Sequence, residues 1–205
     1  MGKWPRELLL ATNNRHKIAE LRELLRGLRD VTLRAPAELG IALDVPEDAP
    51  TYVGNATAKA LAFARKGGLV ALADDSGLEV GALGGEPGVH SARYAGADAS
   101  DADRIALLLE RLRGVPPERR DARFVCVIAV ATPDGEVRTV EDECHGRIAE
   151  SPSGNAGFGY DPVFFLPDRG VTMADLTDAE KNEISHRGRA ARRAVAVIEA
   201  LLAGA

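Results

Sequence analysis

The chain has 205 residues, of which 45% are hydrophobic, and it carries a formal net charge of −5 with a pI of about 5.5. This length and composition suit one globular domain, or one domain with two lobes. General nucleic-acid binders are more often basic, so the acidic balance disfavours duplex binding as the main activity. Basic residues can still cluster locally around a small anionic ligand.

Signals for membranes, export or disulfides are weak. The two cysteines, Cys126 and Cys144, lack metal-type spacing and are interpreted as reduced thiols. The longest clear apolar run, Phe124 to Ala131, is too short to cross a bilayer. Leu8 to Ala11 is too brief for the apolar region of a signal peptide. We therefore expect a cytoplasmic protein that makes no membrane contact.

The first predicted elements enclose a polar loop. Leu8–Ala11 predicts a short buried strand, and apolar residues at helical spacing predict a helix from about Lys17 to Leu28. Between them lies the sequence TNNRHK. A helix N-terminus with exposed N–H groups and a first-turn lysine can bind an anion. An ordinary helix cap explains the same residues, so both interpretations stay open.

An acidic connection and a second helix follow. Prolines between Ala35 and Pro50 predict an irregular loop, which carries Glu47 among its acids. Such a loop is usually just solvated, but it can also bring a carboxylate to a distant metal site. Thr51 is the predicted N-cap of a helix over Tyr52–Lys66, with Val53 among its core-facing residues. Lys59 in this helix is compatible with a plain surface lysine.

Two adjacent acids follow the next apolar run. Leu69–Ala73 predicts a buried strand that ends at Asp74 and Asp75. Crowded carboxylates at the edge of a core cost free energy unless they gain a cation or hydrogen-bond donors. In isolation, a turn cap at Asp74 and a solvated Asp75 is the simpler interpretation. We expect Glu79–Leu83 to form a separate strand that pairs beside this one.

The middle of the chain predicts a helix and a hairpin. Ser100 is a candidate N-cap for a helix over Asp101–Arg113. Phe124–Thr132 and Glu136–Cys144 predict two strands, because the Pro-Asp-Gly sequence between them is a turn signal. Cys126 is expected to be a small core residue of the first strand.

A glycine-rich segment, SPSGNAGFGYD, covers Ser151–Asp161 and contains two aromatic residues. Aromatic side chains among glycines suit a loop that stacks a flat ring, and stacking of a base on such a ring contributes ~1–3 kcal/mol. A turn anchored by Phe158 is the alternative, and the sequence alone leaves both open. Val163–Phe165 is the next candidate strand.

The last elements carry basic residues. Thr177 to Glu180 has the spacing of a capping box, and the helix that it begins contains Lys181. His186 and Arg187 lie at the start of a C-terminal helix predicted over Arg189–Leu202. Basic residues at this position oppose the helix dipole, so a bound anion or an oxo ligand would explain them. A merely exposed pair is the alternative.

Four motifs occur in order along the chain: TxNxxK, ADDSGL, GFGYDP and KxxISHRG. In this order and spacing, from about Leu8 to Arg192, they resemble the inosine triphosphate pyrophosphatase family. These dITP/XTP pyrophosphatases hydrolyse purine nucleoside triphosphates that carry a deaminated base. The resemblance implies an α/β fold, with a long mixed β-sheet flanked by helices and a central nucleotide cleft between two lobes of a single domain over residues 1–205. It also implies Mg²⁺ and a homodimer.

The resemblance further assigns site residues. Asp75 would be the catalytic acidic residue and a metal ligand, with Glu47 as the second metal carboxylate and Ser76 in contact with the purine nucleotide. Gly54 departs from the family pattern, which often has Glu before Asn55. The remaining substrate-binding positions would be Thr12, Asn13, Asn14, Arg15, His16 and Lys17 in the first loop, Phe158, Gly159, Tyr160 and Asp161 in the glycine-rich segment, and Lys181, His186 and Arg187.

The implied reaction converts a nucleoside triphosphate and water into the monophosphate and pyrophosphate by attack at the α-phosphorus. Asp75, or Asp74 beside it, would orient or deprotonate the water. Lys17 and Lys181, with Lys59 as a further candidate, would neutralise charge on the leaving pyrophosphate.

Base selection would depend on the 6-oxo group of hypoxanthine and xanthine. A donor from His186 or Arg187 would pair with this oxygen and would face the amino group of adenine unfavourably. Two alternatives remain at this level. One is a pyrophosphatase for other modified or pyrimidine triphosphates, and the other is a non-enzymatic nucleotide-binding or RNA-binding module.

Overall fold

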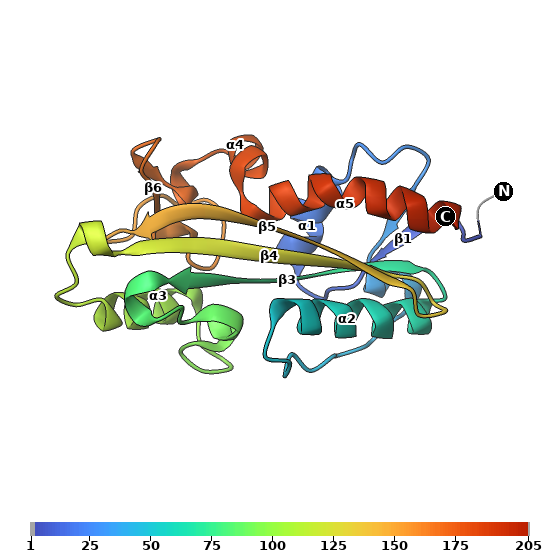
Figure 1. Cartoon of the computed structure of the whole chain (residues 1–205), viewed down its shortest axis with the longest axis horizontal. Helices are drawn as coiled ribbons and strands as arrows, with labels where there is room; N and C mark the ends of the chain where they lie inside the picture. Colours follow the sequence, from blue (N-terminus) through green and yellow to red (C-terminus); the bar gives the residue numbers. More distant parts are fainter. Residues whose placement is uncertain (1–2, 205) are drawn as a thin grey trace. The chain divides into compact units, whose positions relative to one another are not determined.

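The computed structural model describes residues 3–204. Its strands form one seven-stranded sheet with the order β2-β1-β3-β4-β5-β6-β7. Strand β1 is parallel to β2 and β3, whereas β6 is antiparallel to β5 and β7. The predicted mixed sheet flanked by helices is therefore confirmed (Figure 1). The strands are β1 Glu7–Leu10, β2 Thr32–Arg34, β3 Val70–Val80, β4 Asp121–Ala131, β5 Val137–Ile148, β6 Phe164–Leu166 and β7 Val171–Thr172, and the helices are α1 Arg15–Leu24, α2 Tyr52–Gly67, α3 Asp101–Arg111, α4 Asp178–Ile184 and α5 His186–Ala203.

The chain forms two compact units, each made of segments that are distant in sequence. The first unit comprises the chain up to Asp75, residues Cys126–Asp142, and the chain from Arg187 onward. The second unit comprises Ser76–Val125 and Glu143–His186. Each unit is described by itself below.

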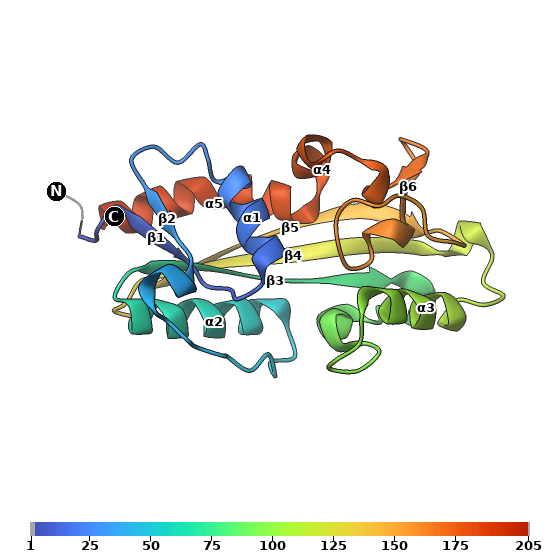
Figure 2. The same cartoon turned by 180° about the vertical axis from the view of Figure 1, so that it is seen from behind.

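The first unit buries its strands on both faces. Leu8, Leu9 and Leu10 of β1 are all fully buried, as expected for a parallel strand that is covered by helices on either side. Helices α1 and α5 pack on the face that includes Leu8, Leu10 and Leu72, whereas α2 covers the opposite face (Figures 1 and 2). Burial of each such leucine stabilises the unit by roughly 1.5–3 kcal/mol.

The second unit has its own hydrophobic core. Ile105 and Leu108 of α3 pack with Leu78 and Val80 from the second half of β3. Apolar residues of β4, β5 and β6 complete this cluster, with Phe124 and Phe164 at a ring-centroid distance of 4.4 Å. The glycine-rich segment adds Tyr160, which is therefore a core residue and not an exposed ring.

Helix starts follow their predicted caps. The Oγ1 of Thr51 accepts a hydrogen bond from Gly54 N, and Gly68 ends α2 in the left-handed conformation. The Oγ atom of Ser100 caps α3, with Asp103 completing a capping box. Thr177 caps α4 in the same way through Glu180. These local signals worked because each cap depends on residues within four positions of one another.

The largest error of the sequence prediction concerns β3. The strand does not end at the two acids but continues through them to Val80, so Asp74 and Asp75 lie in its interior. The segment Gly81–Leu83, expected within a separate strand, forms a short 3-10 helix instead. Acidic residues disfavour strands on average, and the contacts that reverse this preference come from distant parts of the chain.

Smaller differences concern helix ends and faces. Helix α1 ends at Leu24 and not at Leu28, although Leu28 still packs in the core. Helix α5 begins at His186, three residues earlier than predicted. Val53 is 42% exposed and does not face the core. The buried stripe of α2 instead includes Lys59.

The predicted state of the cysteines is confirmed, because both are buried and neither is part of a disulfide. Burial, together with the negative charge of Asp74, raises the pKa of the Cys126 thiol to about 12. Within residues 3–204, no helix is long and apolar enough to cross a membrane.

The close approach of β5 and β6 at Gly146 makes a prediction about stability. A Cβ atom at Gly146 would lie 2.6 Å from the carbonyl oxygen of Phe165 and 2.7 Å from the ring of Phe164. We expect Gly146→Ala to lower the free energy of unfolding by about 1–3 kcal/mol, measured by urea denaturation. Gly27→Ala is the control, since a Cβ there meets no heavy atom of the described residues within 4 Å apart from those of its chain neighbours. Equal midpoints for the two variants would contradict the prediction.

Candidate active site

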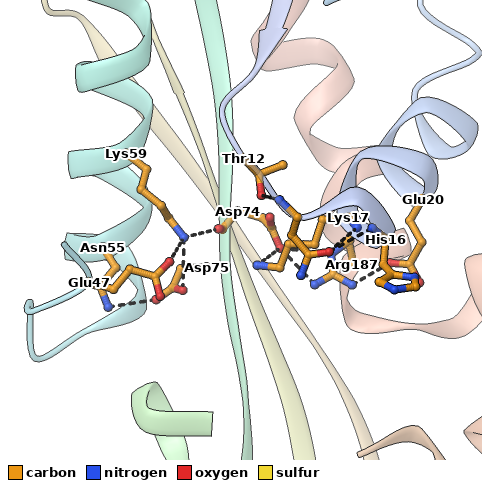
Figure 3. Close-up of polar contacts among 11 residues, drawn as sticks. Thr12, His16, Lys17, Glu20, Glu47, Asn55, Lys59, Asp74, Asp75 and Arg187 are labelled. Atoms are coloured by element: carbon orange, nitrogen blue, oxygen red, sulfur yellow. Dashed lines mark hydrogen bonds and ion pairs between the residues drawn. The ribbon is translucent and has the colours of Figure 1, made fainter. Parts of the chain in front are cut away.

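The two acids of β3 lie on opposite faces of the sheet. Successive side chains of a strand alternate between faces, so Asp74 points to the α1 and α5 side, whereas Asp75 points to the α2 side (Figure 3). Their side chains are almost fully buried, with residue exposures of 1% for Asp74 and 6% for Asp75. Two carboxylates that are adjacent in sequence therefore have separate environments.

Asp74 is held by two cations. Its Oδ2 atom lies 3.0 Å from Lys17 Nζ and 3.0 Å from Arg187 Nη2. Arg187 also donates to Glu20 Oε2 at 2.6 Å, and Glu20 lies one turn beyond Lys17 on α1. Burial alone would raise the pKa of Asp74, but Lys17, Arg187 and Lys59 outweigh it and hold this pKa well below its ordinary value. Asp74 is thus a stable, ionised anchor.

Asp75 has a different balance of charge. Asn55 Nδ2 donates to its Oδ2 atom at 3.1 Å, and Lys59 Nζ lies 3.4 Å from its Oδ1 atom. The same Nζ atom pairs with Glu47 and donates to the Asp74 carbonyl oxygen at 2.7 Å. Burial and the nearby charge of Glu47 raise the pKa of Asp75, because the favourable charge of Lys59 is shared between two carboxylates.

Lys59 pairs with both Glu47 and Asp75, and little in the sequence indicated this role. It is buried, at 9% exposure, and is not a plain surface lysine. Burial would lower the pKa of Lys59, but the charges of Asp74, Asp75 and Glu47 outweigh burial and raise it. Its spacing was an available signal, since residues 55 and 59 are one turn apart on the same helix face.

The departure at Gly54 does not displace the acidic loop from this centre. A Cβ atom at Gly54 would lie 2.7 Å from Ala49 Cβ, so the loop packs closely on the helix start. Asn55 Oδ1 accepts from Ala49 N at 2.9 Å, which ties the loop to the residue that also binds Asp75. Glu47 thereby comes close to Asp75, since both pair with Lys59, and its role as a metal ligand stays a prediction.

The first loop is organised by its own side chains. Asn14 caps α1, and its Oδ1 atom accepts from His16 N and Lys17 N. Thr12 Oγ1 accepts from Asn14 N at 3.2 Å, and Asn13 donates to the Leu43 carbonyl oxygen at 2.9 Å. The cap interpretation is therefore confirmed, while anion binding by this loop stays a prediction. Arg15 and His16 are exposed.

The second unit contains a second group of residues that were predicted to bind substrate. The Oδ2 atom of Asp161 accepts from Phe158 N at 2.9 Å and from Lys181 Nζ at 2.7 Å. The same Nζ atom lies 4.8 Å from the centre of the Phe158 ring, which is half-buried. Gly159 N donates to Asp101 Oδ2 at 2.7 Å. Phe158, Gly159, Asp161 and Lys181 thus form one connected cluster.

Three predicted residues have structural surroundings that the sequence did not indicate. Tyr160 is buried and donates to the Ser91 carbonyl oxygen at 2.9 Å. His186 is buried and stacks on Phe124, with ring centroids 4.7 Å apart. Arg187 is one of the two cations that hold Asp74, and a role for it at the base stays a prediction. Ser76 follows Asp75 in β3 and is half-buried.

Asp75, Glu47, Asn55 and Lys59 together form a group that we call the Asp75 cluster. Its chemistry suits a hard divalent cation. Glu47 and Asp75 offer carboxylate oxygens that converge on one ammonium group, and Mg²⁺ typically uses one or two carboxylates together with substrate phosphates. Among the residues described, no three His, Cys, Asp or Glu side chains gather as a complete metal site.

Comparison with known proteins assigns the class to which this chain belongs. Residues 8–197 match the model of the Ham1 family. This match covers most of the chain and confirms the family that the four motifs indicated. The chain belongs to the Ham1 family.

Individual proteins are similar to this chain over nearly its full length. The chain is 51% identical over 185 residues to a dITP/XTP pyrophosphatase of Geobacillus kaustophilus, covering 90% of each chain. It is 44% identical to the dITP/XTP pyrophosphatase of Bacillus subtilis, covering 95% of this chain and 98% of the other. A solved HAM1 protein from Coxiella burnetii superposes with a TM-score of 0.85 at 42% identity, covering 94% of this chain and 98% of the other.

The two acids predict opposite effects on stability. We expect Asp74→Asn to lower the free energy of unfolding at pH 7 by about 3–5 kcal/mol, because Lys17 and Arg187 would keep buried charge without a carboxylate. We expect Asp75→Asn to raise it, because the folded protein disfavours ionised Asp75. Urea unfolding of both variants against the unmodified chain measures these changes, and a destabilised Asp75→Asn would contradict the second expectation.

The pH dependence follows from the same two shifts. The contribution of Asp74 is present above the ordinary carboxyl pKa, near 3.9, and is lost as pH falls through its lower folded value. The cost at Asp75 is present above its raised folded pKa and vanishes below the ordinary value. The advantage of Asp75→Asn should therefore disappear in acid, as measured by unfolding across a pH series.

Proposed function

We propose that this chain hydrolyses dITP, ITP and XTP to the corresponding monophosphate and pyrophosphate, and so removes deaminated purine nucleotides from the nucleotide pool. The observation that carries the proposal is the Asp75 cluster, in which two carboxylates share one buried lysine. Such an excess of negative charge in a buried place is unfavourable for folding and useful for catalysis. The substrate class is supported by the relatives named dITP/XTP pyrophosphatase.

The chemical step assigns one role to each group of this cluster. Asp75 orients the attacking water and accepts its proton, and a raised pKa makes its carboxylate a better proton acceptor. Asn55 fixes the Asp75 side chain through its hydrogen bond. The water oxygen then bonds to the α-phosphorus, and the bond from this phosphorus to the oxygen of pyrophosphate breaks.

Two lysines supply positive charge near the reacting phosphates. Lys59 is buried beside Asp75, and the side chain of Lys17 keeps 16% exposure at the start of α1. Their charges stabilise the negative charge that grows on the leaving pyrophosphate. Asp74 contributes indirectly, because it holds Lys17 in place. This division favours Asp75 over Asp74 as the proton acceptor on physical grounds.

Glu47 and Asp75 would hold Mg²⁺, together with oxygens of the substrate. When bound, the metal supplies charge neutralisation at the phosphates and lowers the pKa of coordinated water. Lys59 Nζ pairs with both the Glu47 and the Asp75 carboxylate. Its positive charge would compensate their negative charges when substrate and metal leave.

The base would bind through the cluster of the second unit. The Phe158 ring offers a stacking surface, with the Lys181 ammonium beside it. His186 is buried against Phe124, where a hydrogen bond to a 6-oxo group would be little weakened by water. Magnesium dependence and a homodimer stay predictions from the family resemblance, and cytoplasmic residence stays a prediction from the sequence.

Turnover by the unmodified chain and by Asp75→Asn tests the chemical assignment. We expect pyrophosphate release from dITP and XTP at least tenfold faster than from ATP, GTP and dUTP, since the relatives' names point to deaminated purines. Asp75→Asn should lose turnover by roughly two to four orders of magnitude, the range that a general base contributes. Equal rates on dUTP would favour a pyrophosphatase of other specificity, and nucleotide binding without turnover would favour a binding module.

The metal assignment is tested by a matched pair of variants in the acidic loop. We expect Glu47→Gln to raise the Mg²⁺ concentration for half-maximal rate by about tenfold or more, because one of two carboxylate ligands is lost. Asp48→Asn is the control, since Asp48 is an exposed acid adjacent to Glu47. A magnesium titration of dITP hydrolysis measures both, and an equal shift for the two variants would mean that Glu47 acts only through the general charge of the loop.

A further inference from the structure

The segment that carries Phe158 has a backbone of high intrinsic freedom. Phe158 lies between Gly157 and Gly159, whose φ angles of 74° and 64° are both in the left-handed region. It belongs to no helix or strand. Glycines lose more conformational freedom on ordering than other residues do. The position of the Phe158 ring therefore depends on specific contacts that hold the backbone on each side of it.

Two carboxylates make those contacts at successive amides. Asp161 Oδ2 accepts from Phe158 N at 2.9 Å, and Asp101 Oδ2 accepts from Gly159 N at 2.7 Å. Asp161 belongs to the same segment, whereas Asp101 is the first residue of α3 and lies 58 positions earlier in the chain. Hydrogen bonds to ionised acceptors are stronger than those between neutral groups.

Helix α3 does not need Asp101 for its cap. Ser100 Oγ accepts from Asp103 N, and Asp103 Oδ2 accepts from Ser100 N at 2.9 Å, so these two residues complete the capping box. Asp101 pairs through Oδ1 with Arg104, whose guanidinium also donates to the Ala99 carbonyl oxygen. The second oxygen of Asp101 is thereby directed at the glycine-rich segment.

A pocket lies between α3 and the glycine-rich segment. This pocket has a volume of about 540 Å³, is open to the surface, and is lined by Asp101, Ile105, Leu109, Asn155 and Phe158 among others. Side chains do not fill this space, so apolar contact alone does not fix the distance between helix and segment. Asp101 and Gly159 both line the pocket, and the 2.7 Å hydrogen bond between them joins the segment directly to the first residue of α3.

We propose that Asp101 is a positioning residue for nucleobase binding. It fixes the backbone that follows Phe158, so the ring stands ready for a base before substrate arrives. The inference rests on the proposed function for the role of Phe158 as the stacking surface. A preformed surface binds ground state and transition state equally, so its loss raises KM and leaves kcat little changed.

Three variants in the first turn of α3 test this role. Asp101→Ala removes the acceptor, Asp101→Asn keeps an acceptor oxygen, and Asp103→Ala weakens the helix cap without touching the segment. We expect Asp101→Ala to lose the hydrogen-exchange protection of the Gly159 amide, and to raise KM for dITP about tenfold with kcat within about twofold. Asp101→Asn should restore most of both values, and Asp103→Ala should leave both unchanged.

The exchange measurement separates this inference from the proposed function. If the unmodified chain does not hydrolyse dITP, the proposed function fails, while exchange at Gly159 still reports whether Asp101 holds the segment. If dITP is hydrolysed but Asp101→Ala keeps the exchange protection or the KM of the unmodified chain, the positioning role is wrong. If Asp103→Ala reproduces both changes, the effect comes from general loss of helix stability and the inference is overturned.

Discussion

The alternation of side chains along β3 is the constraint on which the rest of the site depends. Because Asp74 and Asp75 are neighbours in a strand, they must point to opposite faces of the sheet. One face is covered by α1 and α5, which bring Lys17 and Arg187 to Asp74. The other is covered by α2, which brings Asn55 and Lys59 to Asp75. A single backbone conformation thus gives two identical side chains two different electrostatic environments.

These environments give the two acids different roles. Asp74 stabilises the fold, and Asp75 is the proposed proton acceptor. Asp74 has more positive than negative charge around it and stays ionised, so it ties the strand to two helices. Asp75 shares Lys59 with Glu47, and its ionised form lowers the free energy of unfolding. Natural proteins tolerate such unfavourable groups where function needs them. The ion pairs among Glu20, Arg187, Asp74 and Lys17 stabilise the strand on one face, whereas Asp75 on the other face has less compensating charge.

The second unit contains a glycine-rich segment that is ordered by specific contacts. Carboxylates accept hydrogen bonds from its backbone N–H groups, at Phe158 and at Gly159. Ser91 adds a further link, since its carbonyl oxygen accepts from the Tyr160 hydroxyl and its Oγ accepts from Leu78 N. The result is an aromatic ring on a fixed backbone, which limits the entropy lost when a flat ligand stacks on it.

The sequence by itself determined the local features of this protein. The caps at Thr51, Ser100 and Thr177, the glycine-rich segment without regular structure, and the family itself follow from residues close together in the chain or from ordered motifs. It also pointed to Asp75, but only through the family resemblance. The tertiary structure decided the rest: that β3 runs through the acids, that Lys59 is buried, and that Arg187 binds Asp74. Each of these depends on charges that distant segments bring together, and local propensity carries no information about such pairs.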